Sequence, residues 1–285
     1  MKDKIIKNVL LVIAIGILVM GGGFVFSLVS GSLPAFREYG FFKMLAGVEW
    51  KTTAGAEQYG MLPFMVGTLM TALTALLLCV PFALPMALFT GEYFRGKVLA
   101  QVLQTIVDLL AGIPSIIYGL WGFYTLRPLL MHWGLSKNGF DILTASVVLA
   151  IMIIPYVASL SSQFIKMVPA DLKEAAYAMG ATRKEVVTKI VFPTVSTGIL
   201  STLILALGRA IGETMAVTML VGNTNKMPHS LLDSGNTMAS LVANQFCEAS
   251  GIRINVLMAI ALVLFVITLV VNSIGRFLIK KVSVQ

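Results

Sequence analysis

Six long apolar runs, separated by short polar segments, dominate the chain. They span residues 9–30, 61–90, 98–126, 140–160, 194–222 and 254–279. A helix rising about 1.5 Å per residue crosses about 30 Å of hydrocarbon in about 20 residues, so each run is long enough to span a bilayer. Only 12% of the residues are charged, whereas soluble domains carry about 25%. The sequence therefore predicts an all-α membrane protein with six transmembrane helices and excludes an ordinary soluble domain.

The distribution of basic residues predicts the orientation of these helices. With six crossings, thirteen Lys and Arg residues fall on the side of the termini and seven on the other side. Because basic residues are enriched in cytoplasmic loops, both termini and the polar segment 166–193 are expected in the cytoplasm. The net charge of +8 thus reflects orientation, and it gives no reason to expect nucleic acid as a partner.

The first apolar run resembles a secretory signal in its charge order, since Lys2, Lys4 and Lys7 precede it. Signal peptides have a shorter apolar core of about 7 to 15 residues, so an uncleaved anchor is the preferred interpretation. Residues 31–60 mix aromatic and charged side chains, which is typical of a segment at the outer interface. We therefore divide the chain into an anchor with an interfacial segment, 1–60, and a core, 61–285.

The polar segment 166–193 contains signals for two short helices. Pro169 cannot continue a preceding helix, and Asp171 with Glu174 three residues later has the spacing of a capping box. A helix is therefore expected to begin near Leu172. Gly180 suits the left-handed position that closes a helix.

A second capping box is predicted where Thr182 precedes Glu185 by three residues. It would begin another short helix, which Pro193 would end before the fifth apolar run.

The same segment resembles the EAA loop of bacterial ABC importer permeases. The matching residues, at the spacing of that loop, are Glu174, Ala175, Ala176, Gly180, Ile190 and Pro193. Phe192 stands where that family usually has Leu, another large apolar residue. The resemblance implies that these residues couple the chain to a separate ATP-hydrolysing subunit, with the short helix docked in a groove of that subunit.

Residues 91–98 imitate a phosphate-binding P-loop. They contain Gly91, four residues, Gly96 and Lys97, but Val98 stands where a magnesium-binding Ser or Thr is required. No strand is expected before the segment either. The chain is therefore predicted to be no enzyme and to hold no cofactor, with ATP and magnesium bound by a partner ATPase.

The fifth run contains a buried charge pair. Arg209 lies near its middle, roughly 20 Å of helix from either end, and Glu213 follows one turn later, next to Thr214. A charge at that depth costs at least about 2.5 to 3.5 kcal/mol, so it should face the bundle or a hydrated path. Two interpretations stay open: a neutralised pair that locks two helices, or a guanidinium that lines the path of an anion. Asp108 in the third run is also expected inside, either as a packing contact or as part of the path.

Metal binding and disulfide formation have little support. Cys79 and Cys247 are expected at different depths, and neither His132 nor His229 has a partner at ligand spacing. A membrane enzyme acting on lipid phosphates would need clustered His or Asp residues, so this class is disfavoured.

Four motifs in order sharpen the family resemblance. They are YGMLPFMVGTLMTAL at 59–73, AGIPSIIYGLWGFY at 111–124, ALGRAIGETMAVTMLVGN at 206–223 and SLLDSGNTMASLVANQF at 230–246. From residue 34 onward the chain resembles the PstC-type permease subunit of bacterial phosphate ABC transporters. The sister PstA type shares Arg-Ala-Ile-Gly-Glu-Thr but usually continues differently.

This resemblance implies a fold, a substrate and a set of partners. The fold would be the MetI-like fold of type I ABC importers in the bacterial inner membrane, and Arg209, Glu213 and Thr214 would lie on the phosphate path. The partners would be a PstA-like permease, a PstB-like ATPase dimer and a PstS-like phosphate-binding protein. Molybdate, sulfate or phosphonate permeases are alternatives, as is an ATP-independent channel or secondary transporter.

Overall fold

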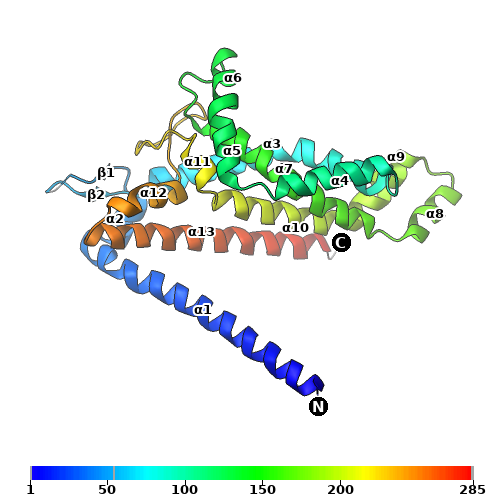
Figure 1. Ribbon diagram of the computed structural model, residues 1–285, viewed down its shortest axis with the longest axis horizontal. Helices are drawn as coiled ribbons and strands as arrows, with labels where there is room; N and C mark the ends of the chain where they lie inside the picture. The colour runs from blue at the N-terminus through cyan, green and yellow to red at the C-terminus, as the bar shows by residue number, and fades with distance from the viewer. Residues whose placement is uncertain (1, 54, 284–285) are drawn as a thin grey trace.

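The computed structural model describes residues 2–53 and 55–283, and almost all of them belong to helices or to the turns between helices (Figure 1). The α-helices are α1 (Lys2–Tyr39), α2 (Phe41–Ala46), α3 (Leu62–Leu88), α4 (Val98–Ala111), α5 (Ser115–Trp121), α6 (Arg127–His132), α7 (Ile142–Lys166), α8 (Ala170–Ala178), α9 (Arg183–Val186), α10 (Phe192–Ile211), α11 (Met215–Thr218), α12 (Met238–Gln245) and α13 (Ile252–Ser283). Short π-helical segments are η1 (Phe89–Tyr93), η2 (Gly122–Leu126) and η3 (Val187–Val191), and η4 (Phe246–Glu248) is a 3₁₀ turn. Strands β1 (Trp50–Lys51) and β2 (Gln58–Tyr59) form an antiparallel hairpin in which Trp50 pairs with Tyr59.

Helix α7 lies at the centre of the bundle, between α3, α4 and α10. Two-thirds of its most apolar stretch is buried, and its side chains form most of the main core. Helix α3 packs against it through small buried residues at helical spacing, which are Ala72, Ala75, Cys79 and Ala83. Small side chains allow two helix backbones to approach closely, which is the usual way that membrane helices pack.

Within the described residues, five helices are long and apolar enough to cross a membrane. A sixth span is obtained if α4 and the helix from Ser115 to His132 count as one, although the two are bent by 93°. The third span predicted over 98–126 is therefore not one continuous helix but a bent pair of helices. Gly112 ends α4, and Pro114 has no N–H to continue the helical ladder, so the chain turns there and α5 with α6 stands across the bundle (Figure 1).

The fifth span also breaks, which the sequence did not predict. Helix α10 ends at Ile211, and the short α11 begins at Met215, so one helix over 194–222 is wrong. Its other end begins earlier than expected, because Pro193 does not terminate the preceding helix. The turn Val187–Val191 is π-helical and leads directly into α10, so that Pro193 occupies the first turn of α10, where its missing N–H costs little.

The two ends of the bundle differ in structure (Figure 1). At one end α2, the β-hairpin and α12 enclose a second core, which contains Met44, Trp50, Phe64, Leu241 and Val256. The interfacial segment predicted over 31–60 is thus a folded cap on the ends of α3 and α13. At the other end α8 and α9 project beyond the spans.

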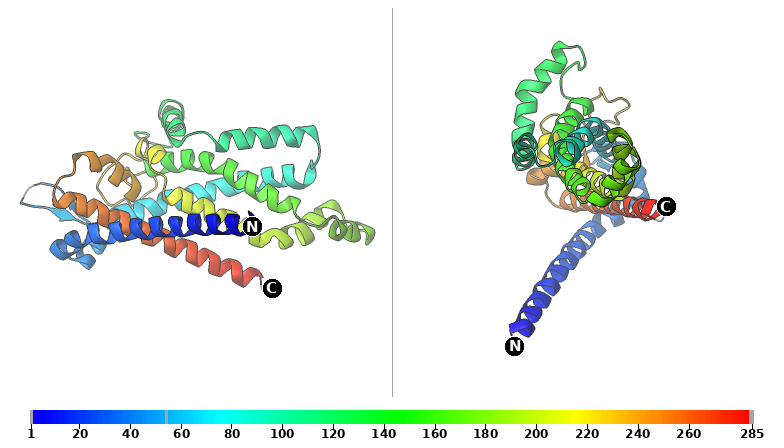
Figure 2. Two further views of the ribbon diagram at one scale, coloured as in Figure 1. Left: turned by 60° about the horizontal axis from the view of Figure 1, so that its bottom comes forward. Right: turned by 90° about the vertical axis from the view of Figure 1, so that its right-hand side faces the viewer.

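Helix α1 contacts the bundle only near its C-terminal end and then diverges from it (Figure 1; Figure 2, right). At the contact, Asn255 Nδ2 donates to the Gly31 carbonyl at 2.6 Å. The beginning of α1 and the end of α13 both lie toward the α8 and α9 end, in keeping with an even number of crossings.

Candidate functional site

The predicted coupling loop folds as the short helix α8 and, after a turn, as α9, which is the first turn of a continuous helical stretch from Arg183 to Ile211. Helix α8 starts differently from the expectation. Its N-terminal cap is Pro169 in an extended conformation (ψ 137°), and no side chain caps the helix. The Asp171–Glu174 capping box is therefore wrong, and α8 begins at Ala170 instead of near Leu172. A cap residue must lie outside the helix, whereas Asp171 already lies in its first turn.

Helix α8 presents two distinct faces. Lys173 and Ala176 point inward and are 9% and 3% exposed, while Glu174 and Ala175 are exposed. Tyr177 beside them is also exposed. Of the predicted Glu-Ala-Ala triplet, two residues are thus available to a partner and the third packs on this chain.

The turn after α8 follows the sequence prediction. Gly180 has φ +83°, the left-handed conformation that favours glycine, and no atom would lie within 4 Å of an added Cβ. The neighbouring Met179 is 83% exposed, so the turn presents a large apolar side chain to its surroundings.

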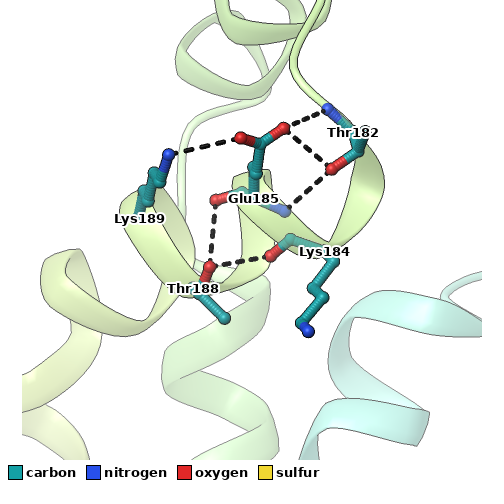
Figure 3. Close-up of polar contacts among 5 residues, drawn as sticks. All are labelled: Thr182, Lys184, Glu185, Thr188 and Lys189. Carbon is teal, nitrogen blue, oxygen red and sulfur yellow. Dashed lines mark hydrogen bonds and ion pairs between the residues drawn. The ribbon is translucent and has the colours of Figure 1, made fainter.

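The Thr182–Glu185 capping box is confirmed (Figure 3). Glu185 N donates to Thr182 Oγ1 at 3.4 Å, and Thr182 N donates to Glu185 Oε2 at 3.0 Å. Lys189 pairs with the other carboxylate oxygen at 3.2 Å. Further along, Ile190 is half-buried under the loop and Pro193 is exposed.

A buried ion pair attaches α8 to the membrane helices, and the sequence analysis did not predict it. Lys173 Nζ lies 2.9 Å from Glu92 Oε2, with the two side chains only 11% and 9% exposed. Glu92 belongs to the segment that imitates a P-loop, which follows helix α3 and not a strand. The signal that could have found it is a pair of opposite charges in two loops on the same predicted side.

The residues predicted for the pathway lie where α10 breaks. Arg209 is in the last turn of α10 and is exposed, and Glu213 and Thr214 follow in the break, partly buried. Arg209 and Glu213 do not form the expected ion pair, since the salt bridges of residues 2–53 and 55–283 join other side chains. Glu213 instead accepts a hydrogen bond from Ala216 N at 3.2 Å, which satisfies a free N–H of the short α11.

Arg209 nevertheless lies beside the middle part of α7. Its guanidinium carbon lies 5.6 Å from the ring centre of Tyr156, a residue about 15 Å of helix from the end of α7 at Lys166. The sequence predicted Arg209 in the middle of a continuous helix, whereas the structure places it in the last turn of α10, beside Tyr156 of α7.

A second polar group lies one turn along α7 from Tyr156. Ser159 Oγ donates to Asp108 Oδ1 at 2.8 Å, and Gln104 Nε2 donates to the same oxygen at 3.0 Å. Asp108 is therefore a contact between α4 and α7, and it is also exposed on the surface of this chain.

The described residues contain neither a cluster of metal-binding side chains nor a disulfide. Cys79 and Cys247 are both free, one buried and one exposed. Among the residues described, no group of three His, Cys, Asp or Glu side chains is placed to hold a metal ion.

Outside the spans, backbone N–H groups of His229 and Ser230 donate to Asp233 and lower the pKa of its carboxyl group.

The arrangement of the helices defines a class of protein by its fold, which is that of type I ABC importer permeases. The structure resembles a chain of a bacterial alginate ABC transporter, solved in complex with a periplasmic protein that holds an alginate pentasaccharide. The TM-score is 0.69 and the identity 20%, over 99% of this chain and 96% of the other. It also resembles the inward-facing MetNI methionine ABC transporter, with a TM-score of 0.63 and 18% identity over 78% and 95% of the two chains.

Residues 83–284 match the family model described as "binding-protein-dependent transport system inner membrane component". The chain belongs to this family and is a multi-pass protein of the inner membrane.

Among its curated relatives are phosphate transport system permease proteins PstC. The protein of Pasteurella multocida is 40% identical over 90% of this chain and 85% of its own length. The protein of Mesorhizobium japonicum is 37% identical over 95% of this chain and 88% of its own length. The protein of Haemophilus influenzae is 36% identical over 99% of this chain and 94% of its own length.

Proposed function

We propose that this chain is a permease subunit of an ATP-driven importer and forms part of the path for inorganic phosphate. The observation that carries the proposal is Arg209, an exposed guanidinium at a helix end within the membrane region. The names of the relatives supply the substrate class. Guanidinium groups match phosphate oxygens with a planar fork of donors, which explains arginine at such a position.

The break between α10 and α11 suits a position on a substrate pathway. A helix that ends within the membrane leaves backbone groups unpaired, and these are tolerated where they line a cavity or a protein interface. Among residues 2–53 and 55–283, Arg209 also has no ion-pair partner, so none of them neutralises its charge. An anion can therefore be attracted there, and because a single exposed arginine binds weakly it can also leave, as conduction requires.

The partners follow from the two surfaces of the chain. The outward face of α8, with Glu174, Ala175 and the Gly180 turn, would dock on a PstB-like ATPase dimer in the cytoplasm, where ATP and magnesium are held. A PstA-like permease would cover the exposed face that carries Arg209. A PstS-like binding protein would deliver phosphate at the end with the β-hairpin and α12.

In this arrangement the protein contributes no hydrolytic chemistry. Closure of the ATPase dimer would move α8 and open the path toward the binding protein, and hydrolysis would reset the path toward the cytoplasm. Arg209 would provide a transient electrostatic well for phosphate at mid-membrane, and Glu213 would stabilise the break by capping α11.

The test is uptake of labelled phosphate in vesicles that contain this chain with its permease and ATPase partners. Arg209→Gln should reduce ATP-dependent uptake by at least about 100-fold, because a charge-assisted contact to a permeating anion in a low-dielectric site is lost. Arg276→Gln removes an exposed arginine at the inner end of α13 and should leave uptake within about twofold of the wild type. Equal membrane levels of both variants establish that assembly is intact.

Competition distinguishes the alternatives. Excess sulfate, molybdate or a phosphonate should leave phosphate uptake unchanged, and removal of ATP should abolish it. Uptake that persists without ATP would identify a channel or secondary transporter, and uptake in Arg209→Gln at the wild-type rate would contradict the path assigned here.

A further inference from the structure

The coupling helix α8 is held by this chain on the face opposite to the one offered to a partner. Lys173 and Ala176 lie three residues apart and share the buried face, while the adjacent Glu174 is exposed. Residues three apart lie on one side of a helix. A push on the outer face of α8 therefore acts directly on whatever Lys173 contacts.

Lys173 contacts the inner end of the α3 helix. Its ammonium group donates to Glu92 at 2.9 Å, and both side chains are almost fully covered. Water screens such a pair poorly, and removing one partner leaves a buried charge without compensation. Most exposed ion pairs contribute little, so this pair is of a different kind from Lys189–Glu185, whose side chains are 73% and 44% exposed.

A second contact joins the same two elements. Arg183, the first residue of α9, donates from Nη2 to the Tyr93 carbonyl at 2.7 Å, and its guanidinium carbon lies 4.4 Å from the Tyr93 ring centre. Adjacent residues of η1, Glu92 and Tyr93, thus receive one cation from α8 and one from α9. Two contacts on separate helices resist rotation as well as translation.

The inner end of α3 is in turn fixed to α7. Thr90 Oγ1 donates to Ser162 Oγ at 3.0 Å in a buried position. Gly91 packs so closely on Ile165 that an added Cβ would lie 2.9 Å from its side chain. The ends of α3 and α7 and both loop helices therefore form one block.

Helix α3 continues from this block across the whole bundle. The continuous helical stretch runs from Leu62 to Tyr93. Near its far end Gly67 approaches the Asn236 backbone, and Thr68 Oγ1 accepts a hydrogen bond from Met238 N at 3.0 Å. One element thus reaches from the cytoplasmic loop to the loop on the opposite side.

We propose that the Lys173–Glu92 ion pair, supported by the Arg183–Tyr93 contact, is the internal link that transmits displacement of α8 to α3. Lys173 and Glu92 are positioning residues: they touch neither phosphate nor the ATPase and act through the helices that they join. The inference rests on the proposed function, because it takes α8 as the element that the ATPase moves.

The experiment compares ATP hydrolysis and phosphate uptake in vesicles with the complete transporter. Glu92→Gln and Lys173→Met should still copurify with the ATPase and hydrolyse ATP, while phosphate transported per ATP falls about tenfold, within the usual range of coupling between sites. The reversed pair, Glu92→Lys with Lys173→Glu, should recover to within about threefold of the wild type. A loss caused only by lower stability would change membrane levels and not this ratio.

Further variants guard against misfolding and non-specific effects. Glu92→Leu with Lys173→Met replaces the pair by apolar side chains, which commonly preserves folding; it should assemble but stay uncoupled. Lys51→Met breaks the exposed pair with Glu49 in the β-hairpin and should transport within about twofold of the wild type.

The results separate this inference from the proposed function. If wild-type vesicles show no ATP-dependent phosphate uptake, the proposed function fails. If wild-type vesicles transport phosphate, and the single variants or the apolar pair transport as much phosphate per ATP as the wild type, only the proposed Lys173–Glu92 link is overturned. A reversed pair that assembles yet couples no better than the single variants would also overturn it.

Discussion

Gly180 is the residue whose backbone most directly shapes the coupling loop. At φ +83° it lets the chain reverse between α8 and α9, and the space around its missing Cβ is open. A side chain at position 180 would therefore destabilise the turn through backbone strain and not through steric clashes with neighbouring atoms. A left-handed backbone costs a non-glycine residue about 1 to 2 kcal/mol, less for Asn and more for a β-branched residue.

This cost predicts a graded series at position 180. Gly180→Asn should keep most phosphate-stimulated ATP hydrolysis, Gly180→Ala should lose part of it, and Gly180→Val should lose most, as the strain grows. Gly134→Ala is the matched control, because Gly134 also has a positive φ (+70°) in open space but lies far from the loop in sequence. Equal activity across the series would show that the turn conformation is not required.

Helix α9 shows how a short element is specified by side chains at its start. The Thr182 and Glu185 side chains satisfy backbone N–H groups that four residues of helix cannot satisfy alone (Figure 3). The sequence spacing was sufficient to predict this start. It failed at α8 because Pro169, a residue without a capping side chain, took the cap position.

Removing the cap should loosen α9 without removing the loop. Thr182→Ala is expected to destabilise this turn by about 0.5 to 2 kcal/mol, whereas Thr182→Ser keeps the hydroxyl and should behave as the wild type. Hydrogen exchange of the amides of residues 183–187 measures the effect. Unchanged protection in Thr182→Ala would show that packing of Val186 and Val187, both buried, holds the helix by itself.

Apolar runs predicted where helices lie but not where they break. An apolar run of this length predicts a membrane-spanning helix, because backbone polar groups in the lipid core must be hydrogen-bonded within the protein. The breaks at Gly112 and Gly212 depend on what neighbouring helices offer to the released backbone groups, which a single sequence does not contain. The Lys173–Glu92 contact was missed because it depends on which elements become neighbours. The expected Arg209–Glu213 ion pair is absent from the described residues because α10 ends between the two.

At the scale of the whole molecule, the bundle has two chemically different ends. One carries α8 and α9, with an exposed Met179, and the other carries the β-hairpin and α12, followed by an exposed Cys247 (Figure 1). The excess of basic residues predicts that the α8 end is cytoplasmic. The buried Cys79 provides an internal reference that water-soluble reagents do not reach.

Cysteine labelling tests this orientation. A membrane-impermeant maleimide should label the native Cys247 in right-side-out vesicles. In a Cys247→Ser background, Met179→Cys should react only in inside-out vesicles, because its side chain position is exposed on the loop. Labelling of Met179→Cys from the outside would reverse the orientation and exclude an ATPase at α8.

The two-faced geometry of α8 also limits how its length can vary in evolution and in engineering. One inserted or deleted residue turns every following side chain by about 100° around the helix axis. Lys173 would then leave Glu92, and the outer face would be rebuilt from other residues. A change of length between Pro169 and Gly180 would therefore disrupt both faces at once, and hybrids between related permeases would have to exchange this segment as a whole.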